Sequence, residues 1–115
     1  MDIAIELLQQ QSDGGTERIA LTSNTISLNG FDCLIDKYLK PMTRVRMAID
    51  LSHYKPNGRR LNPVDRHVQL EAIIVRTEEM RVDGGKMYHT AFFFDNLPDR
   101  VKETITRIIK SKEDE

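Results

Sequence analysis

Three histidines and one cysteine are the residues of this sequence that could bind a metal ion or act as a nucleophile. His53, His67 and His89 fall on separate predicted elements, and none lies four positions from another, the spacing that places two ligands on one helix face. Cys33 is the single cysteine, so one thiolate at most could join them around zinc. We therefore predict no metal site, with the histidines as ordinary strand or loop residues and Cys33 as a small buried apolar residue.

The sequence also offers no residues in a setting suited to acid–base or nucleophilic catalysis. Glu78-Glu79 and Glu113-Asp114-Glu115 lie in polar stretches with no apolar setting to raise a pKa. There is no Gly-x-Ser-x-Gly motif. Gly14-Gly15 and Gly84-Gly85 precede strand patterns rather than helices, which is typical of hairpin turns and not of phosphate-binding loops. We predict that the protein is not an enzyme and has no resident cofactor.

The connection from His53 to Asp65 gathers cations beside an aromatic residue. Tyr54 and Lys55 are followed by Arg59 and Arg60, a combination of charge and stacking surface that suits single-stranded nucleic acid. However, 17 Lys and Arg are balanced by 18 Asp and Glu, so no long-range field favours a polyanion. Nucleic-acid binding through residues 54–60 is therefore an alternative and not the first interpretation.

Length and cysteine content point to one domain in a reducing compartment. A chain of 115 residues can bury roughly two-thirds of its unfolded surface, so we predict a single domain over residues 1–115. One cysteine excludes an internal disulfide, and the first residues lack a signal-peptide pattern, so we expect a cytoplasmic protein. No stretch approaches the ~18 uninterrupted apolar residues of a membrane helix, and we expect no membrane insertion.

Alternating apolar and polar residues dominate the chain from about residue 2 to residue 94 and predict strands. The fourth is the clearest, since Val45, Met47 and Ile49 alternate with Arg44 and Arg46. The second half of the fifth and all of the sixth are apolar on both faces, so we expect both faces to be covered, with Phe92 to Phe94 in the core. The six predicted strands are Ile3–Leu7, Ile19–Leu21, Phe31–Ile35, Val45–Leu51, Val68–Arg76 and Tyr88–Phe94.

The period changes to that of a helix after the sixth strand. Leu97, Val101, Ile105 and Ile108 recur at helical spacing, and Pro98 suits a first turn, so we predict an amphipathic helix over about 98–111. We expect its apolar stripe to cover the outer faces of the fifth and sixth strands. Apolar surface left over at Ile105, Ile108 and Ile109 would form a surface for a homo-oligomer or a partner protein. The fold class is thus all-β with a C-terminal helix, a small six-stranded antiparallel barrel.

The segment Thr25-Ile26-Ser27-Leu28-Asn29-Gly30 resembles a motif of the PilZ family of cyclic-di-GMP signalling domains. That motif reads Asp/Asn-x-Ser-x-x-Gly at a junction of two strands; Ser27 and Gly30 match it, and Thr25 takes the acidic or amide position. The order of the downstream strands, the Leu39–Thr43 segment and the final helix is also similar. The resemblance implies a β-barrel that binds a nucleotide at Thr25, Ser27, Asn29 and Gly30. From the residues alone, a tight turn at Asn29-Gly30 is the favoured interpretation.

The resemblance also implies an Arg-x-x-x-Arg segment ahead of the first strand, whose guanidinium groups would bind guanine edges and phosphates. Because the first strand is predicted from about Ile3, we expect these arginines to be missing. The cations that could replace them are Arg18, Arg44 and Arg46. We therefore predict a non-enzymatic signalling or adaptor domain that binds cyclic-di-GMP weakly or not at all and acts through protein contacts. The alternative is a working cyclic-di-GMP receptor whose arginines come from those positions or from a partner subunit.

Overall fold

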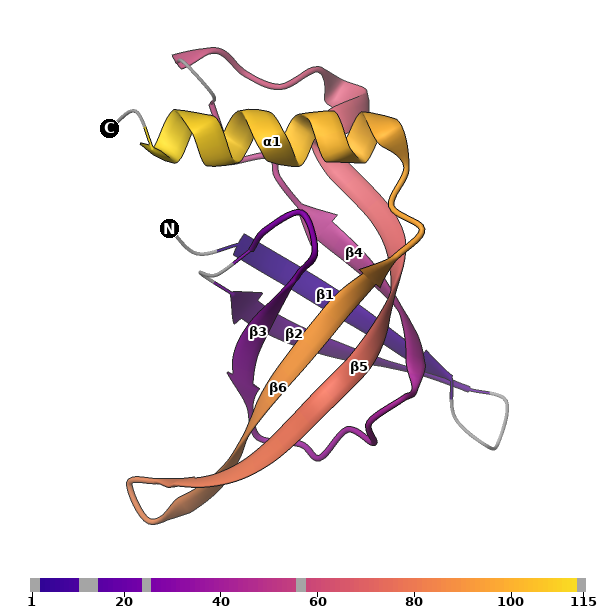
Figure 1. The fold of residues 1–115 in the computed structure, drawn as a ribbon, viewed down its shortest axis with the longest axis vertical. Helices are drawn as coiled ribbons and strands as arrows, with labels where there is room; N and C mark the ends of the chain where they lie inside the picture. Colours follow the sequence, from indigo (N-terminus) through magenta and orange to yellow (C-terminus); the bar gives the residue numbers. More distant parts are fainter. Residues whose placement is uncertain (1–2, 11–14, 24–25, 56–57, 114–115) are drawn as a thin grey trace.

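The computed structural model describes residues 3–10, 15–23, 26–55 and 58–113. It contains six strands and one long helix, in the order predicted (Figure 1). The fifth and sixth strands extend beyond the predicted limits. The elements are β1 Ile3–Gln10, β2 Thr16–Ser23, β3 Gly30–Ile35, β4 Arg44–Asp50, the 3-10 turn η2 Pro63–Asp65, β5 His67–Val82, β6 Gly85–Asp95 and α1 Asp99–Glu113.

All six strands belong to one antiparallel sheet with the order β2-β1-β4-β5-β6-β3. The sheet curls into a half-barrel that brings its two edge strands, β2 and β3, toward each other (Figure 1). The Ser23 hydroxyl donates to the main-chain oxygen of Asp32 at 2.9 Å, and Lys37, just after β3, forms an ion pair with Glu17 of β2. These contacts join the two edges, and the predicted small antiparallel barrel is confirmed as a curled half-barrel.

The core follows the predicted alternation. In β4, Val45, Met47 and Ile49 are buried while Arg44 and Arg46 are exposed, because successive side chains of a strand point to opposite faces. The inward side chains of the strands form one cluster with the buried face of α1. This cluster includes Cys33, whose burial and nearby Asp32 raise the pKa of its thiol to about 12, so Cys33 is a buried apolar residue as predicted.

Helix α1 lies across one end of the half-barrel (Figure 1). Its side chains Val101, Ile105 and Ile108 are buried in the core, and Arg100 donates to the buried carboxylate of Asp65 at 2.7 Å. Pro98 directly precedes the helix, and its carbonyl oxygen accepts the N–H of Lys102. The helix therefore closes the end of the barrel. The prediction that it covers the outer faces of the fifth and sixth strands is wrong.

β5 and β6 form a long hairpin that extends past the rest of the sheet (Figure 1). Two residues, Asp83 and Gly84, connect the strands, and both have positive φ, which matches the twist of the flanking strands. The hairpin turn predicted at Gly84-Gly85 is thus confirmed, whereas the one predicted at Gly14-Gly15 involves residue 14, outside the described residues. The register shifts between Ile74 and Arg76, so Val75 is an extra residue in a β-bulge.

Candidate functional site

Ser27 organises the turn that leads into β3. Its main-chain N–H donates to the carbonyl oxygen of Gly30 at 2.9 Å, and its hydroxyl lies 3.1 Å from the same oxygen. The hydroxyl oxygen in turn accepts the N–H groups of Asn29 at 3.2 Å and Gly30 at 3.4 Å. The Ser27 side chain therefore serves the turn itself. Thr25, predicted to share in this site, lies outside the described residues.

Gly30 is required by the approach of two strands. A Cβ atom at this position would lie 1.9 Å from the main-chain oxygen of Phe92, and φ is +159°, a conformation that is almost exclusive to glycine. The adjacent N–H of Phe94 donates to the carbonyl oxygen of Asn29 at 2.8 Å. The Ser-x-x-Gly pattern thus has a complete local explanation in the joining of β3 to β6.

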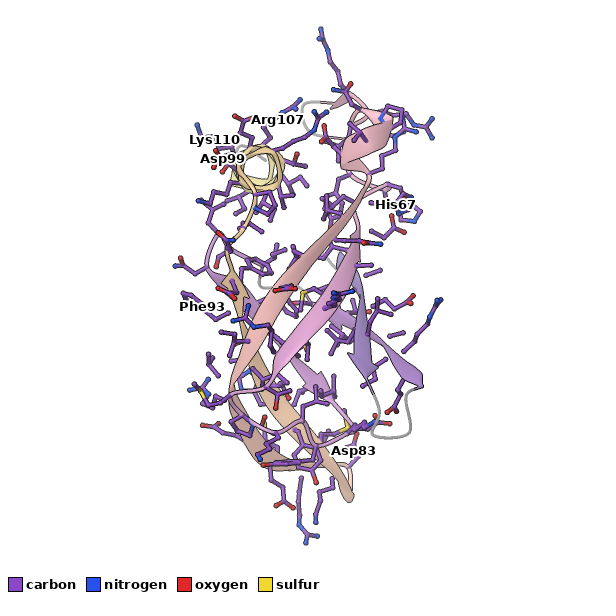
Figure 2. All side chains as sticks on the ribbon, turned by 90° about the vertical axis from the view of Figure 1, so that its right-hand side faces the viewer. His67, Asp83, Phe93, Asp99, Arg107 and Lys110 are labelled. Carbon is purple, nitrogen blue, oxygen red and sulfur yellow. The ribbon has the colours of Figure 1, made fainter. Side chains whose placement is uncertain are left out.

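The outer surface beside this turn is apolar. Phe93, opposite Gly30 in the register, is 51% exposed, and Val75, the extra residue of the bulge, is 48% exposed. Figure 2 shows Phe93 on the outer side of the sheet, below the helix. Side chains of β5 and β6 and the turn enclose a shallow depression of about 310 Å³. We call this surface the Phe93 face; its residues are Ser27, Asn29, Gly30, Val75, Ala91 and Phe93.

The exposure of Phe93 corrects the prediction that Phe92, Phe93 and Phe94 are all core residues. Phe92 and Phe94 point inward and are buried, and Phe92 stacks on Phe31 with ring centroids 4.8 Å apart. Phe93 points outward and is half exposed, because helix α1 closes the end of the barrel and does not cover this face. Its position across from Gly30 suits an aromatic residue that shields the main chain next to a glycine.

Arg44 lies in the same register row as the Phe93 face. The row Arg44, Ile73, Phe93 and Gly30 crosses four strands, which places Arg44 three strand spacings, roughly 14 Å, from Gly30. Its guanidinium donates to Glu71 at 3.2 Å and also forms an ion pair with Asp95. Arg44 is therefore engaged by two carboxylates.

The other two predicted cations do not reach the turn. Arg46 is exposed two register rows from Arg44, opposite Glu71. Arg18 lies five residues before Ser23 on β2, roughly 16 Å along the strand, and forms an ion pair with Glu6 at 3.5 Å. The structure thus does not gather Arg18, Arg44 and Arg46 around Ser27.

Two features of this surface were missed from the sequence. Asp32, next to Gly30 on the outer face of β3, pairs with His89 at 3.2 Å and adds a carboxylate where an anion would approach. Arg76, exposed on β5 opposite Ala91, forms an ion pair with Glu78 at 3.7 Å. Strand alternation places Asp32 on an outer face, but it would place Arg76 inward together with Ile74. The bulge at Val75 turns Arg76 outward, and nothing local in the sequence indicated this bulge or that the two strands adjoin the turn.

The remaining chemistry predicted from sequence is distributed over the molecule. His67 lies 3.6 Å from Asp50, far along the sheet from the His89–Asp32 pair. Within residues 3–10, 15–23, 26–55 and 58–113, no group of three or more His, Cys, Asp and Glu side chains could hold a metal ion. No helix in the same ranges is long and apolar enough to cross a membrane.

The segment 54–60, predicted as an alternative nucleic-acid site, does not expose its aromatic residue. Tyr54 is only 6% exposed and belongs to the core cluster, so its ring is not offered to a base. Lys55, Arg59 and Arg60 are exposed. Charge without a stacking surface does not support the nucleic-acid interpretation.

Comparisons with known proteins identify the fold. No family model and no curated protein sequence matches the chain. Among solved structures, the PilZ domain of YcgR from Escherichia coli with c-di-GMP has a TM-score of 0.60 at 16% identity, over 99% of this chain and 90% of that one. At such low identity the likeness concerns the fold, and the chain has a PilZ-like fold.

A second similar structure is MrkH from K. pneumonia. One crystal form gives a TM-score of 0.67 at 11% identity, and the apo state gives 0.65 at 10% identity. Both alignments cover 97% of this chain but only 48% and 50% of MrkH, so the chain spans about half the length of that protein. The predicted fold class is therefore confirmed over nearly the whole chain.

Proposed function

We propose that this chain is a non-enzymatic signalling or adaptor domain of PilZ-like fold that works in the cytoplasm, binds cyclic-di-GMP weakly or not at all, and acts through contacts with a protein. One observation carries the proposal: the surface beside the Ser27–Gly30 turn is an exposed apolar face centred on Phe93, and the arginine in its register row is engaged by two carboxylates.

The charges around the Phe93 face oppose a ligand with two phosphates. Asp32, Glu71, Glu78 and Asp95 bring four carboxylates to this part of the outer surface, against Arg44, Arg76 and the neighbouring His89. A phosphate would have to displace carboxylates from Arg44 before it could use the guanidinium. Charge-assisted hydrogen bonds contribute about 1.5–3 kcal/mol each, so two that are not made lower the affinity ~100-fold or more.

The same surface suits a protein segment that brings an apolar side chain flanked by Lys or Arg. Exposed aromatic residues in shallow depressions are frequent anchors of protein interfaces. Phe93 and Val75 offer the apolar contact, and the excess of carboxylates over arginines at its edges gives the face a net negative charge that complements Lys or Arg. The composition of the face therefore supports the adaptor role.

Isothermal titration of the full chain with cyclic-di-GMP tests the nucleotide part. We expect no saturable binding at low micromolar concentration; such binding would favour the alternative of a working receptor. That alternative is supported by the likeness to the YcgR PilZ domain with c-di-GMP. Under it, Arg18→Ala, Arg44→Ala or Arg46→Ala reduces binding at least tenfold, whereas Arg107→Ala, on the exposed side of α1, leaves it unchanged.

The protein part is tested with fluorescent peptides that carry Leu and Phe flanked by Lys, compared with the same peptides flanked by Glu. We expect the chain to prefer the Lys-flanked set, and Phe93→Ser to abolish the preference. Val64→Ser is the matched control, because Val64 is 62% exposed near η2, away from the Phe93 face. Equal binding of both peptide sets, or full binding by Phe93→Ser, contradicts the proposal.

A further inference from the structure

Beyond Thr77, whose hydroxyl donates to the main-chain oxygen of Leu39 at 2.6 Å, β5 is a strand edge that the described structure leaves open. β4 pairs with β5 only from His67 to Ile73, and the main chain of Met42 and Thr43 bonds to Ile74. From Arg76 to Val82, β5 pairs with β6 alone among the described residues. Met80 and Val82 are 42% and 39% exposed on this projecting hairpin. Asp83, at its tip, lies at the opposite end of the molecule from α1 (Figure 2).

The two-residue turn determines which main-chain groups face this edge. Val82 and Gly85 close the hairpin as a hydrogen-bonded pair, and hydrogen-bonded and non-hydrogen-bonded pairs then alternate along an antiparallel ladder. Met80, opposite Met87, consequently turns its main-chain N–H and C=O toward β6. The main-chain groups of Glu79 and Arg81 face outward and are available to another strand.

We propose that this edge pairs with the same edge of a second copy of the chain, antiparallel and centred on Met80. In this register Glu79 lies opposite Arg81 of the second copy, and Arg81 lies opposite Glu79, so two ion pairs form from one short segment. Glu79 and Arg81 are then the hydrogen-bonded positions, as their outward main-chain groups require. A register centred on Glu79 or on Arg81 would instead place like charges opposite each other, which is unfavourable.

The environment of Arg81 favours the same pairing. Within its own hairpin, Arg81 stands opposite Lys86, which is bound to Glu79 at 3.1 Å. Among the described side chains, no carboxylate lies within ion-pair distance of Arg81. In the proposed dimer, Glu79 of the second copy supplies this carboxylate. On the other face of the joined hairpins, the two Met80 side chains meet at a non-hydrogen-bonded pair, where side chains approach most closely. The paired segment is short, so the dimer is weak and concentration-dependent.

Charge exchange tests the pairing in the full chain by sedimentation equilibrium at low salt. We expect a monomer–dimer equilibrium whose dissociation constant rises at least tenfold in Glu79→Arg alone or in Arg81→Glu alone. An equimolar mixture of the two variants restores dimerisation, because every facing pair is then of opposite charge, and the double variant restores it as well. A monomer at all concentrations, or a dimer indifferent to these changes, overturns the inference.

Cross-linking tests the register independently. Facing non-hydrogen-bonded residues have Cα atoms about 4.5 Å apart, within the range of a disulfide, so Met80→Cys forms a covalent dimer on mild oxidation. Val82→Cys is the matched control, because Val82 faces Glu78 of the second copy and does not cross-link. The native Cys33 is buried and does not interfere. Cross-linking of Val82→Cys in preference to Met80→Cys contradicts the Met80-centred register. The pairing does not depend on what the Phe93 face binds.

Discussion

The helix-capped end of the barrel and the Phe93 face use apolar side chains in opposite ways. At the capped end, Ile105 and Ile108 are 1% and 4% exposed, and Arg100 ties the helix to the buried Asp65. On the Phe93 face, two large apolar side chains remain about half exposed in the folded chain. Apolar surface at the capped end therefore stabilises the fold, whereas that on the Phe93 face remains available to a partner.

The largest expected difference in the free energy of unfolding is between substitutions of one residue from each region. Ile105→Ala should lower the free energy of unfolding by about 2–5 kcal/mol, because it removes buried methyl groups and leaves a cavity. Phe93→Ser should lower it by about 1 kcal/mol or less, because much of the ring already contacts water. Urea denaturation of both variants measures the difference, and equal losses would show that the Phe93 face is part of the folding core.

Gly30→Ala tests a residue of the Phe93 face that, unlike Phe93 and Val75, is tightly packed. We expect a loss of about 1–3 kcal/mol, because the new Cβ must displace the main chain at Phe92. Gly85→Ala is the control, because its nearest contact would be an ordinary 3.5 Å. Thermal unfolding checks both; a neutral Gly30→Ala would mean that β3 and β6 separate easily.

Arg100→Ala tests the bond between helix and barrel. The carboxylate of Asp65 would remain buried without its 2.7 Å partner, and we expect a loss of stability that clearly exceeds that of an exposed arginine on the same helix. Arg107→Ala, exposed on the same helix, should stay within about 0.5 kcal/mol of the native chain. Chemical denaturation of the two variants measures the difference. Equal stabilities would mean that α1 is held to the barrel by apolar packing alone.

Ser52→Ala gives the smallest effect and a pH signature. The Ser52 hydroxyl and N–H donate to Asp50 at 2.6 and 2.9 Å, and these hydrogen bonds hold the pKa of Asp50 below its ordinary value of 3.8. Stabilisation from a lowered pKa is present above the unfolded pKa and is lost as pH falls through the folded one. The variant should be about 0.5 kcal/mol less stable at neutral pH. Denaturation at about pH 7, 5 and 3 should show this difference shrink below about pH 4, where the Asp50 carboxylate begins to be protonated; a constant difference would refute the explanation.

The strands were predictable because alternation is a local property of the sequence. Val45, Met47 and Ile49 needed only their neighbours to be assigned inward. The helix was predictable for the same reason. The position of the helix was not predictable, because the sequence shows that the helix and the outer faces of two strands are apolar but does not show which apolar surfaces pack together. Ile105 instead packs over the barrel end, and the outer residues at Phe93 and Val75 stay uncovered.

The candidate site was predictable only as far as it is local. Ser27 and Gly30 are close in sequence, and their contacts confirm that they share one turn. The ion pair of Arg44 with Asp95 joins residues 51 positions apart, so the charge state of this surface depended on the strand order. The bulge at Val75 had no sequence signal, since an extra residue among apolar neighbours does not interrupt the pattern.

The join between β2 and β3 has a consequence for how the chain opens. The contacts between these edge strands include the hydrogen bond of the Ser23 hydroxyl and the Lys37–Glu17 ion pair, whereas the other adjacent strands are joined by ladders of main-chain pairs, with one bulge in the β5–β6 ladder. Thermal fluctuations should therefore separate β2 from β3 before any other pair of neighbouring strands. Amide deuterium uptake should accordingly begin along β2 and β3. The first two strands would then swing outward as one flap about their ladder with β4, which makes this junction the weak line of the fold.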